Sequence, residues 1–128
     1  MAKLTTHVLD TASGKPAAGL RVVLRRADAP AVLAEATTNA DGRLDKPLLE
    51  GGAFKPGAYE ISFHVGDYFR KAVASSGNAD FLDVVPVRFT VTAARDTHVP
   101  LLISPYGYST YRGSKHEHDP EKWEPVFG

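Results

Sequence analysis

The sequence contains no cysteine among its 128 residues. It therefore offers no disulfide bond, no thiolate ligand for a metal ion and no cysteine nucleophile. A chain of this length forms one domain by default. It is also long enough to bury a full hydrophobic core, so we expect a fold that is stable without cross-links.

The sequence also lacks an excess of charge and a long apolar run. Fifteen Lys and Arg residues balance fifteen Asp and Glu residues, so the formal net charge at pH 7 is zero. This argues against a nucleic-acid or membrane-surface partner bound by electrostatics. No segment reaches the roughly 18 apolar residues of a membrane span. The start, MAKLTTHVLD, lacks the apolar stretch of a signal peptide, so we expect a cytoplasmic protein unless a leader has been removed.

Short alternating segments, separated by turn signals, run through most of the chain. The clearest is Tyr59–Phe63, whose apolar residues fall on one face, as in a half-buried strand. Further strands are expected at Leu4–Leu9, Leu20–Leu24, Ala31–Thr38, Leu44–Leu49, Val84–Val91, Val99–Ile103 and Tyr108–Arg112. One short helix is expected over Asp67–Ala74, with Asp67 as its N-cap. Seven to eight short strands with one helix are typical of an antiparallel β-sandwich, so we predict an all-β fold.

The most unusual stretch is THVPLLISPYGYSTYRGS, at positions 97–114. It places three tyrosines, three serines, a histidine and an arginine within eighteen residues. A surface hairpin rarely needs so many directional polar groups, and a core strand rarely tolerates them without partners. We therefore expect a functional site in this stretch.

The last fourteen residues, KHEHDPEKWEPVFG, differ in character from the rest of the chain. They are charged, contain two prolines and show no periodicity, which is typical of a loosely docked or disordered extension. His116 and His118 are spaced for a strand or loop, and no third histidine lies near them. A solvated tail is therefore favoured over a metal site, and no metal is predicted.

Four segments carry a resemblance to a known family. They are LTTHVLDTASGKPAAGL, the DGR turn at 41–43, PGAYEISFHVGDYF, and HVPLLISPYGYSTYRGS with its closing tetrapeptide Tyr111–Ser114. Together they resemble the transthyretin-related family, specifically its 5-hydroxyisourate hydrolases. The likeness covers about residues 3–114. Its last motif is the most specific, because vertebrate transthyretin carriers lack Tyr-Arg-Gly-Ser.

The resemblance implies a fold, an activity and an assembly. The fold is an eight-stranded transthyretin-like sandwich at 1–114, followed by a charged extension at 115–128. The activity is hydrolysis of 5-hydroxyisourate to 2-oxo-4-hydroxy-4-carboxy-5-ureidoimidazoline in urate (purine) degradation, without a cofactor. The assembly is a homotetramer, a dimer of dimers, with sites in the channel between dimers. Most relatives end at Tyr-Arg-Gly-Ser, so a peptide bond replaces their terminal carboxylate at Ser114.

The resemblance also assigns site residues that would otherwise look structural. His7, Arg43, His98 and Ser114 match the catalytic residues of the family, and His7, Arg43 and Tyr111 match its substrate-binding residues. By themselves these would be strand histidines, a loop arginine, a loop serine and a half-buried tyrosine. His64 matches nothing in the family and is interpreted as structural. Arg112 is expected to be partly structural.

The chemistry suits these residue types. Hydrolysis of a cyclic acyl-urea bond needs an activated water, a stabilised oxyanion and a protonated leaving nitrogen. Two histidines can handle the protons, although the sequence does not say which is the base, and the forked charge of Arg43 can clamp carbonyl oxygens. A covalent serine mechanism is disfavoured, because no Gly-x-Ser-x-Gly motif is apparent. The alternatives to a hydrolase are a transthyretin-type carrier and a non-catalytic paralogue whose tail plugs the channel.

Overall fold

The computed structural model describes residues 2–72, 81–93 and 95–113 of the chain. Residues 1, 73–80, 94 and 114–128 lie outside the described structure. Within the described ranges, no helix is long and apolar enough to cross a membrane.

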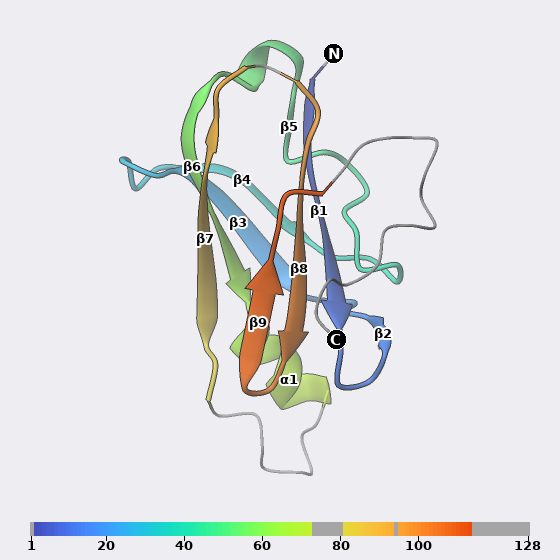
Figure 1. Cartoon of the computed structure of the whole chain (residues 1–128). Helices are drawn as coiled ribbons and strands as arrows, with labels where there is room; N and C mark the ends of the chain where they lie inside the picture. The colour runs from blue at the N-terminus through green and yellow to red at the C-terminus, as the bar shows by residue number, and fades with distance from the viewer. Residues whose placement is uncertain (1, 73–80, 94, 114–128) are drawn as a thin grey trace.

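The strands of the described ranges form two sheets packed as a sandwich (Figure 1). The first sheet contains β1 (Lys3–Asp10), β2 (Lys15–Pro16), β5 (Leu49–Glu50), β8 (Thr97–Ser104) and β9 (Gly107–Thr110). The second contains β3 (Arg21–Arg26), β4 (Val32–Thr37), β6 (Gly57–His64) and β7 (Val84–Val91). The order is β2-β1-β8-β9 in the first sheet, where β5 also pairs with β1, and β4-β3-β6-β7 in the second. The predicted all-β sandwich is confirmed.

One pairing differs from the antiparallel arrangement that we predicted. Strands β1 and β8 run parallel, with Leu4 beside Thr97 and Asp10 beside Ile103 (Figure 1). All other strand pairs are antiparallel within the described ranges. A parallel pair cannot be joined by a tight turn, so its strands come from distant parts of the chain. Here the pair brings the segment that contains His7 beside the segment that contains His98.

Alternating side chains from both sheets fill the space between them. Every second residue of β1 is buried, beginning at Leu4, and Tyr59, Ile61 and Phe63 of β6 are buried in the same way. The shared core cluster includes Leu4, Val8, Val22, Leu24, Tyr59, Ile61, Phe63, Val99, Leu101 and Ile103. Each such side chain contributes roughly 1.5–3 kcal/mol on burial. This packing holds β1 and β8 firmly, and it thereby fixes the residues that alternate onto their outward faces.

The helix begins two residues earlier than we predicted. It is α1 (Val65–Ala72), and it starts directly after β6 at one end of the sandwich (Figure 1). Val65 is fully buried, and the backbone N–H of Gly66 donates to the carbonyl oxygen of Asp83 at 2.8 Å. A Cβ at Gly66 would lie 2.8 Å from the carbonyl oxygen of Leu82, so only glycine fits this close approach. Tertiary contacts therefore set the start of the helix, and Asp67 is not its N-cap.

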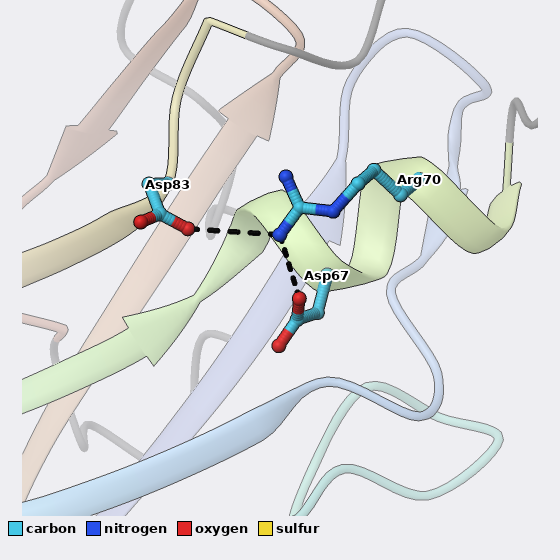
Figure 2. A network of polar contacts seen from close by, with 3 residues as sticks. All are labelled: Asp67, Arg70 and Asp83. Carbon is cyan, nitrogen blue, oxygen red and sulfur yellow. Dashed lines mark hydrogen bonds and ion pairs between the residues drawn. The ribbon is translucent and has the colours of Figure 1, made fainter.

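Asp67 instead forms part of an exposed ion-pair network. Arg70 Nη2 lies 2.6 Å from Asp67 and 3.7 Å from Asp83, just before β7 (Figure 2). The hydrogen bond from Arg70 lowers the pKa of Asp67. Exposed pairs of this kind stabilise weakly, so the burial of Val65 and Phe69 matters more for holding the helix. The predicted end of the helix at Ala74 lies outside the described residues.

The strand that we predicted over Leu44–Leu49 is wrong. Only Leu49 and Glu50 pair with β1, and a 3₁₀ turn, η1 (Gly51–Ala53), follows at once. Pro47 has no backbone N–H, so this segment cannot continue a ladder. It is tied to β1 instead by the backbone N–H of Leu48, which donates to the Leu4 carbonyl at 2.8 Å. The remaining predicted strands are present, with bounds shifted by up to two residues.

Candidate active site

The candidate site lies on the outward face of β1 and β8. Because side chains alternate along a strand, the burial of Leu4 and Val8 in the core turns Thr5 and His7 to the other face. His98 faces outward for the same reason, since Val99 and Leu101 belong to the core. The parallel register then sets Thr5 beside His98 and His7 beside Pro100. Two histidines from opposite ends of the chain thus share one face.

The imidazole rings of His7 and His98 are neighbours. Their centroids lie 6.4 Å apart, and the ring planes are tilted by 34°. Thr5 Oγ1 lies 2.8 Å from His98 Nδ1, so the two side chains are hydrogen bonded.

A tight turn brings Arg43 against His7. The Asn39 side-chain oxygen accepts hydrogen bonds from the backbone N–H groups of Asp41, at 2.9 Å, and Arg43, at 3.2 Å. Gly42 has a φ of 74°, and a Cβ there would lie 2.4 Å from the Val8 carbonyl oxygen. The turn therefore needs glycine both for its left-handed backbone and for its close approach to β1. As a result, Arg43 forms a β-bridge with His7.

The surroundings of His7 favour its neutral form. Burial of the imidazole lowers the pKa of His7 below its ordinary value of 6.5, and the nearby positive charge of Arg43 lowers it further. A hydrogen bond to the Asp41 backbone and the Asp41 carboxylate act in the opposite direction. The net result is a lowered pKa, so His7 is mostly neutral at pH 7 and can accept a proton.

A small pocket adjoins these residues. It has a volume of about 110 Å³ and is lined by Thr5, Thr6, Arg43, Leu44 and Lys46. Two of its five residues carry a positive charge, which suits a substrate with carbonyl oxygens or an anionic form. Thr5 connects the pocket to His98 through its hydroxyl group.

Tyr111 and Gly113 approach the same region from β9. Thr110 pairs with Leu101, and Gly113 forms a bridge with His98, so Tyr111 lies between these contacts beside β8. Burial raises the pKa of Tyr111, which keeps its phenol protonated at neutral pH. Arg112 is exposed.

The structure thus brings together most of the residues that the sequence predicted. His7 lies beside His98 and forms a β-bridge with Arg43, and Tyr111 lies nearby on the segment that leads to Gly113. Ser114 and the tail histidines, His116 and His118, lie outside the described residues. Among the described residues, no group of three or more histidine, aspartate or glutamate side chains could hold a metal ion.

Sequence reasoning missed two residues of the site, Thr5 and Lys46. Thr5 could have been found from its position, because residues two apart in a strand share a face with His7. Lys46 gave no such signal, since it lies in the segment that we had predicted to be a strand. His64, interpreted as structural, ends β6 in the other sheet and forms no part of this group.

The arrangement suits hydrolysis of an acyl bond. A neutral imidazole can take a proton from water, a second imidazole can deliver one to a leaving group, and a guanidinium can stabilise an oxyanion. All three groups occur here on a rigid strand pair or on a turn bonded to it.

Comparison with known proteins identifies relatives over nearly the whole chain. The model of the HIUase/Transthyretin family matches residues 4–113. The 5-hydroxyisourate hydrolase 2 of Rhizobium meliloti is 55% identical over 115 residues, which cover 88% of this chain and 96% of that protein. The solved structure of Klebsiella pneumoniae 5-hydroxyisourate hydrolase is 34% identical with a TM-score of 0.74, covering 89% of this chain and all of that one. Sea bream transthyretin in complex with thyroxine shares the fold, with a TM-score of 0.78, 24% identity, and coverage of 90% and 98% of the two chains.

Proposed function

Because the chain belongs to the HIUase/Transthyretin family, we propose that it hydrolyses 5-hydroxyisourate in the breakdown of urate. The product is 2-oxo-4-hydroxy-4-carboxy-5-ureidoimidazoline. The observation that carries the proposal is that His7 and His98 lie side by side on one outward face, with Arg43 bridged to His7. This trio supplies each of the groups that opening a cyclic acyl-urea bond requires.

In the proposed reaction, His7 is the general base. Its pKa is lowered, so it is neutral at pH 7 and can take a proton from water as the water oxygen attacks the ring carbonyl. Arg43, beside His7, donates hydrogen bonds to the carbonyl oxygen as negative charge develops on it. His98 delivers a proton to the ring nitrogen when the carbon–nitrogen bond breaks. The carbonyl carbon becomes a carboxylic acid, which loses its proton to solvent to give the carboxylate. Proton exchange with solvent then restores neutral His7 and protonated His98.

Two further residues are proposed to assist the reaction. Tyr111, whose phenol stays protonated, is proposed to contact the substrate ring. Ser114 follows Gly113 directly and is proposed to orient the attacking water or His98 through its hydroxyl. Ser114→Ala should then lower the rate while leaving substrate binding nearly unchanged. A variant that matches the original chain in both would remove Ser114 from the mechanism.

We propose that the working form is a homotetramer, a dimer of dimers. Both histidines lie on an outward sheet face, which a second dimer can cover to make a closed channel. Light scattering on the full chain should give four times the monomer mass of 13.8 kDa. A monomer that hydrolyses the substrate at full rate would contradict this part of the proposal.

The activity itself is tested with freshly made 5-hydroxyisourate. Its decay is followed by ultraviolet absorbance with and without the protein. We expect decay much faster than the spontaneous reaction. Decay at the spontaneous rate would leave a carrier or a plugged channel, and these are separated by deleting residues 115–128. A large rise in rate on deletion would identify the extension as a plug.

A further inference from the structure

The imidazole of His98 is held on two sides by groups to which neither the sequence nor the family resemblance assigns a role. On one side, Thr5 stands beside His98 in the parallel register, with Thr5 Oγ1 at 2.8 Å from His98 Nδ1. His98 is only 6% exposed although it faces away from the core cluster. A ring that is so enclosed has little freedom to turn, so its contacts decide which nitrogen is available for chemistry.

On the other side, the backbone of Gly113 lies against the ring. The backbone N–H of Gly113 donates to the His98 carbonyl oxygen at 2.9 Å. A Cβ added to Gly113 would lie 2.6 Å from His98 Cδ2 and 3.2 Å from Cγ. Gly113 is not among the described glycines with positive φ, so any residue could adopt its backbone conformation. Glycine is needed there because the imidazole occupies the space of a side chain.

We infer that Thr5 and Gly113 are positioning residues that clamp His98, with Thr5 accepting a hydrogen bond from Nδ1–H. The proton on Nδ1 then stays in place whether the ring is charged or neutral. Nε2 is left as the nitrogen that releases and regains the proton. This inference rests on the proposed function for its catalytic consequence, but the hydrogen bond itself can be tested without any activity.

The proposed direction of this hydrogen bond is compatible with what each group can do. A threonine hydroxyl has one proton and two acceptor positions, so it can accept from Nδ1–H while it donates elsewhere. Thr5 is half-buried and lines the pocket beside Arg43, where water or substrate can accept its proton. Holding one imidazole nitrogen by a hydrogen bond is a general way to fix the tautomer of a functional histidine.

The first experiment reads the tautomer of His98 by long-range ¹H–¹⁵N NMR on the full chain. In the original protein at high pH, we expect the proton on Nδ1 and an unprotonated Nε2. Thr5→Val should shift the neutral ring toward the Nε2–H form, and Thr5→Ser should restore the original pattern. A proton on Nε2 in the original protein, or spectra unchanged by Thr5→Val, would overturn the inference.

The second experiment measures the consequence for catalysis. Thr5→Val should lower kcat by about tenfold or more while KM changes little, because the binding residues remain and only the proton transfer is misaligned. Thr5→Ser should recover most of the rate. The matched control is Thr11→Val, which removes a hydroxyl bond from the end of β1 to the Ile103 carbonyl of β8 but none to a histidine. An equal loss of kcat in the control would make Thr5 merely structural.

Gly113→Ala tests the other side of the clamp. The added methyl group must push the imidazole away, so the Thr5–His98 hydrogen bond should be lost and kcat should fall with it. Because both substitutions release the same ring, the double variant should lose less than the product of the two single effects. Fully multiplicative effects would contradict a shared clamp. Should the protein not hydrolyse 5-hydroxyisourate at all, the NMR results would still decide the hydrogen bond.

Discussion

The two outward faces of the sandwich use their polar side chains differently. On the second sheet, Arg88 pairs with Glu60 at 2.8 Å, and Arg21 pairs with Glu35. On the first sheet, two histidines stand 6.4 Å apart with Arg43 bridged to one of them. The outward face of the second sheet, which we call the paired face, thus carries charges that are neutralised in ion pairs. The outward face of the first sheet gathers groups that can exchange protons and hold negative charge, so it is the proposed reactive face.

The place of a residue on an outward face does not by itself show whether it belongs to the proposed site. Both faces alternate with the same core, and the longest strands of both sheets have eight residues. What distinguishes them is the parallel pairing of β1 with β8 and the turn that brings Arg43 to β1. The comparison predicts that substitutions on the reactive face change the rate of hydrolysis with little effect on stability. Substitutions on the paired face should have only small effects on both the rate and the stability.

The largest effect is expected from His7→Ala. Removing the proposed general base should slow hydrolysis by roughly 10²–10⁴-fold. The midpoint of thermal unfolding and the assembly should stay close to those of the original protein, because His7 is outside the core cluster. The matched substitution on the paired face is Arg88→Ala, which should leave the rate unchanged. A His7→Ala protein with the original rate would remove His7 from the mechanism.

The next effect is expected from Arg43→Lys. Lysine keeps the positive charge but lacks the planar fork that can hold two oxygens at once. The value of kcat/KM should fall by about 10²–10³-fold, as on loss of an oxyanion donor. Arg88→Lys on the paired face is the control. An Arg43→Lys protein with normal kinetics would show that only the charge matters.

A smaller effect is expected on the pKa of His7, which one substitution should raise and another should lower. Arg43→Gln removes a positive neighbour and should raise the pKa of His7 toward 6.5, whereas Asp41→Asn removes a negative neighbour and should lower it further. Titration of the histidine ring protons by NMR measures both. In the original protein, kcat/KM should fall on acidification, with the midpoint of the fall below pH 6.5. Shifts of the same sign in the two variants would contradict this account of the charges around His7.

The smallest effect is expected for the ion pair between Arg21 and Glu35. Both side chains are about half exposed, at 51% and 46%, so water screens the attraction. A double-mutant cycle with Arg21→Ala and Glu35→Ala should give a coupling of about 0.2–1 kcal/mol in the free energy of unfolding. Urea denaturation measures it, and hydrolysis should be unaffected. A coupling of several kcal/mol would mean that the paired face contributes far more to stability than its exposure suggests.

Local patterns in the sequence were enough to predict most strands. Alternation along Tyr59–Phe63 and Val84–Val91 reports which side chains face the core, and this needs no knowledge of the partner strand. Alternation does not report the direction of pairing, so the parallel arrangement of β1 and β8 was missed. The helix start was missed because close packing at Gly66, a tertiary effect, outweighs the capping preference of Asp67.

The site was predicted chiefly from the family resemblance. No local signal connects His7 with His98, since a separation of more than ninety residues is bridged only by the sheet. The position of Arg43 was visible in part, because Asn39 and Gly42 predict a turn, but its contact with β1 was not. Thr5 was overlooked because a strand threonine is common and its hydrogen-bond partner lies 93 positions away.

That same separation has a consequence for how the protein is made. Strand β1 leaves the ribosome first, whereas β8 begins only at Thr97 of 128 residues. Until then β1 has a bare edge on the side that β8 will occupy, and such edges attract other chains. Contacts so distant in sequence also slow folding. For most of its synthesis, the nascent chain therefore lacks His98 of the proposed site and carries a strand edge that is prone to aggregation.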